Sequence, residues 1–340
     1  MRDELKHSLM AQLDRAKDSD DIWSLLVSAG VLGLPFKEEY GGSGLDPVLG
    51  FTVLEVLGPR AIASPYLESI LLAGTLLQRS EGNAAAFWLP QLALGKAKLA
   101  LAWLDGKQAA QAVKNGDDWI LSGSKNIVIG GHDADAIIIT VTAQKNGPNE
   151  EVTAFLLPRE AIPLTSYPTI DGRHAADLHL DGITVPDSAR LAISGDDIAE
   201  TLDLGAAAVA SESAAIMAQL VSSTRDYCVQ RKQFDQSLSQ FQVVQHRLAD
   251  MLIQARRADA AAKLAAEALS LPPSARAKTI SAAKVTIADA GRFVGQNAVQ
   301  LHGGMGMTEA LPISALFKRL TIIEGEFGTR DEHLARYMGL

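Results

Sequence analysis

Cysteine and excess positive charge are what this chain of 340 residues most clearly lacks. A single cysteine, Cys228, excludes an internal disulfide framework and a metal site built from cysteines. The formal net charge of −9 disfavours nucleic acid as the main partner, because phosphate binding needs a basic face. We therefore expect neither a nucleic-acid partner nor a metal centre.

Long hydrophobic runs are also scarce, although 47% of the residues are hydrophobic. The longest alanine-rich candidate, residues 205–221, is broken by Ser211-Glu212-Ser213, so no membrane span is expected. Residues 1–7 are polar and contain no signal-peptide core. These features favour a cytoplasmic protein. Aromatic residues make up only 5%, which predicts a core built mainly of Ala, Leu, Val and Ile.

Hydrophobic periodicity divides the chain into three parts. Apolar residues recur at helical spacing in the first part, over residues 5–16, 21–29, 46–57 and 64–78. Short strand-like runs follow, separated by Asn-Gly and Asp-Gly turns; they span residues 98–103, 119–122, 136–142, 152–157 and 177–180. Long helical patterns fill the rest. We expect a mainly α, α+β protein with an N-terminal helical domain (1–97), a middle β-barrel or sandwich domain (98–190) and a C-terminal four-helix bundle (195–340).

The sequence predicts an apolar face on one helix of the expected bundle. Phe241, Val244, Leu248, Met251 and Leu252 lie at helical spacing and are expected to pack against the other helices.

Three segments carry a distinctive pattern. The first is the turn-rich loop of residues 34–45. The second is Arg231-Lys232-Gln233-Phe234, continued by Phe241-Gln242 and by Leu248-Ala249-Asp250-Met251. The third is Gln300-Leu301-His302-Gly303-Gly304 with Met305-Gly306-Met307-Thr308. In this order and spacing they resemble the acyl-CoA dehydrogenase family, and together with the domain order the resemblance spans nearly the whole chain.

The resemblance implies an FAD oxidoreductase that introduces a double bond into an acyl-CoA thioester. It also implies a set of flavin contacts, several of them made to the flavin of a neighbouring subunit: Arg231, Gln233, Phe234, Leu238, Gln242, Gln300, Gly303, Gly304 and Thr329. The chemistry is consistent, since a pyrophosphate needs a guanidinium or backbone N–H groups. Taken alone, Arg231 would be a helix-terminal arginine favoured by the dipole, and Gly303 a simple helix terminator.

The position of the catalytic base departs from the family pattern. Where the family has Glu-Gly-Thr, with a glutamate that removes the substrate's α-proton, this chain has Phe327-Gly328-Thr329. A minority of the family has its base near the start of the first long bundle helix, where this chain has Gly205. Glu326 and Glu324 lie nearby and are candidate bases, or else solvated loop charges. Glu212 is expected to make a polar contact between helices.

The middle domain departs from the family pattern as well. The usual Thr-Glu-Pro segment is replaced by Trp103-Leu104-Asp105, and Asn126-Ile127-Val128-Ile129 lacks the usual aromatic-Ile-Thr. Contacts to a neighbour's flavin are thus kept better than contacts to the chain's own flavin ring.

The resemblance leads to one main hypothesis and two alternatives. The main hypothesis is a small partner subunit, paired with a homologous acyl-CoA dehydrogenase chain in a heterotetramer, with electron-transfer flavoprotein as acceptor. The first alternative is a self-sufficient homo-oligomeric enzyme that uses Glu326 or Glu324 as its base. The second is a flavin-free acyl-CoA-binding or scaffold protein.

Overall fold

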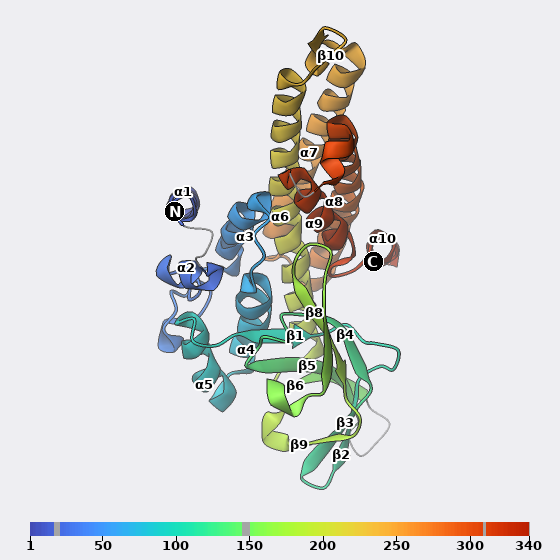
Figure 1. Cartoon of the computed structure of the whole chain (residues 1–340). Coiled ribbons are helices and arrows are strands. Elements are labelled where there is room, and N and C mark those ends of the chain that lie inside the picture. The colour runs from blue at the N-terminus through green and yellow to red at the C-terminus, as the bar shows by residue number, and fades with distance from the viewer. Residues whose placement is uncertain (17–20, 145–149, 309–310, 340) are drawn as a thin grey trace. The chain divides into compact units, whose positions relative to one another are not determined.

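The computed structural model describes residues 1–16, 21–144, 150–308 and 311–339 (Figure 1). The chain forms two compact units. The first contains Met1–Gly50 and Ser64–Leu202, and the second contains Phe51–Ala63 and Asp203–Leu340. The boundary falls within the long helix α6 (Gly195–Gln230), which therefore contributes residues to both units. The three-domain division by residue range stays a prediction.

The helices of the first unit begin near the positions that periodicity predicts. They are α1 (Arg2–Leu13), α2 (Ile22–Ser28), the π-helix η4 (Leu67–Gly74), α4 (Thr75–Ser80) and α5 (Gly82–Ala93), with short 3₁₀ turns at Glu38–Tyr40 and Pro47–Gly50. Asp21 caps α2 by accepting a hydrogen bond from the backbone N–H of Ser24. Helix α5 lies outside the four predicted ranges; it begins at Gly82 and contains Pro90.

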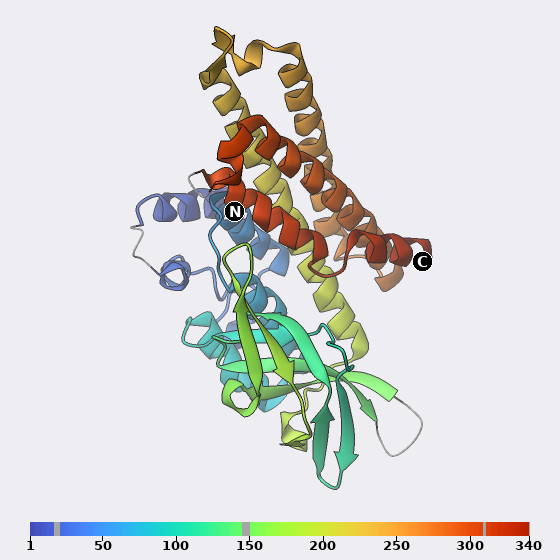
Figure 2. The ribbon, with the colours of Figure 1, turned by 45° about the vertical axis from the view of Figure 1, so that its right-hand side comes forward.

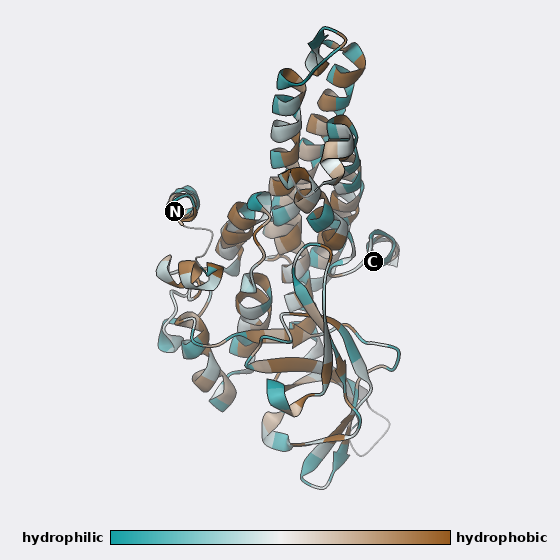
Figure 3. Cartoon of the chain, viewed as in Figure 1, coloured by the Kyte–Doolittle hydropathy of each residue, from teal (hydrophilic) through white to brown (hydrophobic). Residues whose placement is uncertain are grey.

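The strands of the first unit form a larger and a smaller sheet. The larger has the order β1-β5-β2-β3-β9, with β6 also paired to β5, and the smaller has the order β4-β8-β7. Their bounds are β1 (Leu99–Ala102), β2 (Gln111–Asn115), β3 (Asp118–Ser122), β4 (Ser124–Ile129), β5 (Ala136–Gln144), β6 (Glu150–Pro158), β7 (Leu164–Pro168), β8 (His174–His179) and β9 (Ile183–Pro186). Strands β1 and β5, which are rich in apolar residues (Figure 3), pair in parallel and are buried throughout most of their length.

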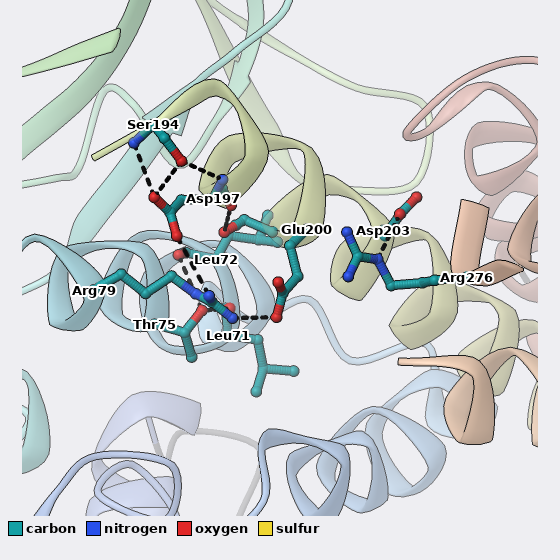
Figure 4. A network of polar contacts seen from close by, with 10 residues as sticks. Leu71, Leu72, Thr75, Arg79, Ser194, Asp197, Glu200, Asp203 and Arg276 are labelled. Atoms are coloured by element: carbon teal, nitrogen blue, oxygen red, sulfur yellow. Dashed lines mark hydrogen bonds and ion pairs between the residues drawn. The ribbon is translucent and has the colours of Figure 1, made fainter. Parts of the chain in front are cut away.

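The beginning of α6 is fixed within the first unit by a polar network (Figure 4). Ser194 and Asp197 bond to each other as a helix cap, and Arg79 of α4 pairs with both Asp197 and Glu200. These groups are partly exposed, so the network orients the helix more than it stabilises the fold.

The second unit is a helical bundle. It contains α3 (Phe51–Leu57) with the 3₁₀ turn Gly58–Arg60, most of α6, α7 (Gln242–Ala268), α8 (Pro273–His302), α9 (Pro312–Gly325) and α10 (Arg330–Gly339). A two-stranded hairpin, β10 (Lys232–Gln233) with β11 (Gln236–Ser237), and the 3₁₀ turn Leu238–Gln240 join α6 to α7 at one end of the bundle (Figures 1 and 2). The expected fold class, N-terminal helices followed by sheets and a C-terminal helical bundle, is confirmed.

Helix α7 packs on α8 mainly through small residues. Its buried positions are Val244, Met251, Ala255, Ala258, Ala261, Ala262, Ala265 and Ala268. The prediction that Leu252 joins this face is wrong, because 46% of its side chain is exposed. A helix turns about 100° per residue, so Leu252 points well away from the seam that contains Met251.

Helix α6 is long and apolar enough to cross a membrane by length and composition, contrary to the expectation from residues 205–221. It is the one such helix in the part of the chain that the structure describes. However, 78% of its most apolar window is buried inside the structure, as in the core helix of a bundle.

Candidate functional site

The ring of Phe327 packs directly on Gly205 of α6. A Cβ atom built on Gly205 would lie 2.5 Å from Cε1 of this ring, far inside van der Waals contact. Phe327 has a backbone φ of 59°, which is uncommon for a residue other than glycine and holds its side chain in one direction. The two positions at which a base was sought therefore face each other, and neither carries a carboxylate.

Arg319 of α9 donates hydrogen bonds to two carboxylates, one of which belongs to the residue that precedes Phe327. Its Nε and Nη2 donate to Glu212 of α6 at 2.8 and 2.7 Å, and its Nη1 donates to Glu326 at 2.7 Å. All three side chains are largely buried. Burial alone would lower the pKa of Arg319, but Glu212 and Glu326 outweigh it and raise that pKa well above its ordinary value.

This cluster corrects one expectation and confirms another. Glu326 is not a solvated loop charge, because the buried guanidinium of Arg319 holds its carboxylate as an acceptor. Glu212 makes the helix–helix polar contact that was expected of it. Glu324 lies on the outer side of α9 and pairs with Arg292 of α8.

Two further side chains fix the backbone around Phe327. Lys284 of α8 donates to the carbonyl oxygens of Ile323 and Glu326 at 2.9 and 2.7 Å. His333 of α10 hydrogen-bonds the carbonyl oxygen of Phe327 through Nε2 at 3.0 Å. Burial lowers the pKa of Lys284 to about 8, although the charge of Glu326 opposes this change. Burial, together with the charge of Lys284, lowers the pKa of His333 to about 4. Hydrogen bonds to the carbonyl oxygens of residues 326 and 327 thus hold the backbone of this loop, although the side chain at position 327 is a phenyl ring.

Sequence reasoning missed Lys284, Arg319 and His333. A faint signal was available, since Arg319 and Lys284 stand at apolar-periodic positions of their helices, where a charge needs a buried partner.

The expected flavin contacts around residue 231 lie at the end of α6 and on the hairpin. Arg231 directly follows α6, and its carbonyl oxygen accepts a hydrogen bond from Leu238. Phe234 and Asp235 both have positive φ, as a two-residue hairpin turn requires, and Phe234 is 86% exposed. Gln233 and Gln242 are exposed as well.

The second group of expected contacts lies where α8 ends. Gly303 has φ 61° and ψ −144°, a conformation open to glycine alone, and it ends the helix as predicted. The neighbouring His302 ring stacks on Tyr227 of α6 with centroids 4.2 Å apart. A surface hollow beside this stack is lined by α6, His302 and the start of α9. The ends of α6 and α8 are thus joined, while Gln300 stays exposed.

Thr329 lies apart from these groups. Its backbone N–H and its hydroxyl both donate to the carboxylate of Glu332, at 2.7 and 2.9 Å. This is a capping arrangement at the start of α10. A flavin contact of Thr329 remains a prediction.

The residues at the end of the bundle suit a phosphate-bearing cofactor. The guanidinium of Arg231 and the amides of Gln233, Gln242 and Gln300 are exposed hydrogen-bond donors. No atom lies within 4 Å of a Cβ built on Gly303 or Gly304, so a ligand can approach the backbone there. The chemistry of this donor set fits a flavin pyrophosphate.

In the first unit, the segment Trp103–Asp105, which lacks the Thr-Glu-Pro sequence that the resemblance implies, is held by hydrogen bonds. The buried ammonium of Lys125 donates to the carbonyl oxygen of Trp103, the carboxylate of Asp105 and the hydroxyl of Thr140. Burial lowers the pKa of Lys125, and Asp105 opposes that change. Ile127 has a backbone φ of 53°, which is uncommon for a β-branched residue. Among the described residues, no cluster of three or more His, Cys, Asp or Glu side chains is placed to bind a metal ion.

Comparison with known proteins gives two family matches. The family model described as the acyl-CoA dehydrogenase C-terminal domain matches residues 195–337, and that of the acyl-CoA dehydrogenase N-terminal domain matches residues 1–96. Acyl-CoA dehydrogenase FadE27 of Mycobacterium tuberculosis is 28% identical over 343 residues, which cover 96% of this chain and 89% of that protein. Probable acyl-CoA dehydrogenase YngJ of Bacillus subtilis is 27% identical, over 89% of this chain and 84% of that protein.

Two solved structures illustrate the similarity of fold. The ChsE4-ChsE5 complex from Mycobacterium tuberculosis matches with a TM-score of 0.87 and 25% identity, covering 99% of this chain and 96% of the matched chain. Butyryl-CoA dehydrogenase from Megasphaera elsdenii matches with a TM-score of 0.85 and 24% identity, covering 99% and 97%.

Proposed function

We propose a function from the premise that this chain belongs to the acyl-CoA dehydrogenase family: it is a partner subunit that donates flavin contacts to a homologous catalytic chain. Membership of the family makes the reaction class oxidation of a CH–CH bond and the cofactor FAD. The partner role goes further than family membership and is supported by the local geometry.

The observation that carries the proposal is the contact of Phe327 with Gly205. A phenyl ring cannot accept a proton, and a glycine offers no side chain. The carboxylates of Glu326 and Glu212 share the buried guanidinium of Arg319, which engages both of them as hydrogen-bond acceptors. A general base must instead lie within reach of the substrate's α-carbon and release its proton in each cycle.

The residues at the end of the bundle have the complementary role. When bound, FAD accepts the hydride that leaves the substrate. Arg231 is positioned to neutralise a phosphate, and Gln233 and Gln300 to donate hydrogen bonds beside it. The open backbone at Gly303 and Gly304 lets the cofactor approach. Because these groups are exposed, they can reach a flavin whose site is completed by another chain.

A similar solved structure that contains two different chains supports separate roles for two subunits. The ChsE4-ChsE5 structure is a complex of two differently named chains, and this chain is 25% identical to the matched one. By analogy, the proposed assembly is a heterotetramer of this chain and a homologous acyl-CoA dehydrogenase subunit, located in the cytoplasm. Electron-transfer flavoprotein is the proposed acceptor of the electrons.

The test is co-expression with a candidate homologous chain, purification through a tag on this chain, and measurement of FAD per chain. One FAD per two chains, with activity only in the complex, is the expected result. If this chain alone oxidises an acyl-CoA at an ordinary enzymatic rate, the partner role is wrong. A colourless complex would instead indicate a flavin-free scaffold.

Two variants test the alternative that this chain is itself an active enzyme with Glu326 or Glu324 as its base. Glu326→Gln and Glu324→Gln would each be assayed in the complex with FAD content recorded. The partner role predicts that neither abolishes turnover in a complex that retains FAD and its fold. Loss of turnover in Glu326→Gln, with FAD and stability unchanged, would identify Glu326 as the base.

A further inference from the structure

The hollow beside the ends of α6 and α8 has a volume of about 290 Å³, close to the lower end of the range for small-molecule sites. Four of its lining side chains come from α6 and repeat every three or four residues, so they share one face of that helix. They are Ser223, Asp226, Tyr227 and Gln230. His302 at the end of α8 and residues 311–313 at the start of α9 complete the lining, so polar groups face an apolar wall.

The hollow is separate from the predicted flavin contacts on α8. Gln300 and His302 are two residues apart in sequence, which places them about 200° apart around the helix. Gln300 is exposed, whereas His302 is only 4% exposed and lines the hollow. A ligand in the hollow would therefore meet a different face of α8 from the one predicted to contact flavin.

His302 offers a hydrogen-bond acceptor to this space. Its Nδ1 lies 2.8 Å from the carbonyl oxygen of Ala298, which can only accept, so the neutral ring has its lone pair on Nε2. Burial lowers the pKa of His302, although the bond to Ala298 opposes this change, so the ring is neutral near pH 7. Within the described part of the chain Nε2 has no hydrogen-bond partner. Polar atoms of buried side chains are generally bonded, and a ligand would supply the missing donor.

The charges around the hollow favour a positive ligand. Asp226 is the one acidic residue among the side chains that line it, and no Lys or Arg is among them. Arg225, outside this lining, donates to Oδ1 of Asp226, and Oδ2 makes no hydrogen bond to the residues that the structure describes. Helices α6 and α8 both end here, so two negative dipole ends meet one positive end, that of α9.

We propose that this hollow binds a small organic cation, which carries an ammonium or amidinium group on an apolar body. The cationic group donates to Asp226 and His302, and the apolar body packs against Leu311 and Ile313. The amide oxygen of Gln230 is a further acceptor. The inference goes beyond the partner role and does not depend on it.

Benzamidine and benzamide are matched probes, because they share a phenyl ring and differ in charge. Isothermal titration calorimetry of the full chain near pH 7 measures the binding of each. Benzamidine is expected to bind about tenfold or more tightly than benzamide, through a charge-assisted hydrogen bond. Asp226→Asn should remove this preference. Asp250→Asn, which changes an exposed acid on α7, is the control and should keep it.

A preference for benzamidine that is lost only in Asp226→Asn supports the proposal, provided that far-UV circular dichroism shows both variants to be folded. Equal binding of the two probes by the wild type overturns it, as does the absence of benzamidine binding at about 10 mM. A preference that persists in folded Asp226→Asn also overturns it.

A second measurement distinguishes the hollow from the flavin contacts. The assembled protein is titrated with benzamidine while its bound FAD is followed by fluorescence. FAD content is expected to stay constant, because the hollow lies on another face of α8. Displacement of FAD by benzamidine would show that the cation enters the flavin site, and the separate site would then be wrong.

Discussion

At the scale of single residues, the contact between Phe327 and Gly205 decides how the site is interpreted. Lys284 and His333 hold the backbone of this loop through its carbonyl oxygens, so its conformation does not depend on a carboxylate at position 327. Such pre-organisation is typical of a functional loop. A phenyl side chain on this well-held loop agrees with the proposed role of this chain, which is binding and not proton abstraction.

The close packing predicts the effect of Gly205→Ala. The added methyl would lie 2.5–2.9 Å from the ring of Phe327, so the variant should lose about 1–3 kcal/mol of unfolding free energy, measured by urea denaturation. Adding Phe327→Leu should restore part of that loss. Gly325→Ala, where no atom lies within 4 Å, is the control. Equal effects of the two alanine variants would contradict the packing.

His333 predicts a pH dependence of stability. Its pKa is about 4 in the folded protein and 6.5 as an unperturbed side chain, so the folded state favours the neutral ring. This contribution is complete above pH 6.5 and is lost as the pH falls towards 4, by about 2 kcal/mol after allowing for partial solvent contact. Urea denaturation of His333→Gln over this range should show a shallower acid loss than the wild type. If the unfolding free energies of the wild type and of His333→Gln fall in parallel over this pH range, His333 is not the source of the pH dependence.

At the scale of elements, the ion cluster joins α6 to α9. Arg319 bonds Glu212 on one helix and Glu326 at the end of its own, all largely shielded from water. A buried cluster of this kind adds little net stability over an apolar core, but each member depends on the others.

Arg319→Met should therefore destabilise the protein by about 3–5 kcal/mol, because two buried carboxylates lose their partner. Chemical denaturation measures the change. The matched control is Arg292→Met, which breaks the more exposed pair with Glu324 and should cost about 0–1 kcal/mol. Similar losses from the two variants would show that the cluster at Arg319 behaves as a surface pair.

At the scale of the whole molecule, the residues predicted to contact flavin and the predicted base position belong to different parts of the bundle. Arg231 and Gly303 lie at helix ends that are joined through Tyr227 and His302, whereas Phe327 lies against α6 at Gly205. Loss of one function therefore need not affect the other, and a subunit can keep its cofactor contacts after losing its base.

This separation predicts that Arg231→Ala lowers the FAD affinity of the assembled protein about tenfold or more, since it removes a charge-assisted contact to phosphate. Release of flavin fluorescence on dilution measures the change. Arg256→Ala, exposed on α7, should leave FAD retention unchanged. Equal retention in both variants would remove Arg231 from the cofactor contacts.

The sequence by itself determined the fold class and most helices, because hydrophobic periodicity and glycine-marked ends are local signals. The resemblance in the sequence also predicted Phe327 at the position where the family has its base. The short strands β2, β4, β7 and β9 were not predicted, since pairing with distant strands stabilises them more than local propensity does. Only the tertiary structure brought Phe327 onto Gly205 and Glu326 onto Arg319, because contacts between helices far apart in sequence leave no periodic trace. It likewise turned Leu252 and Ile253 outward, since the chain alone does not say which face of α7 meets its neighbours.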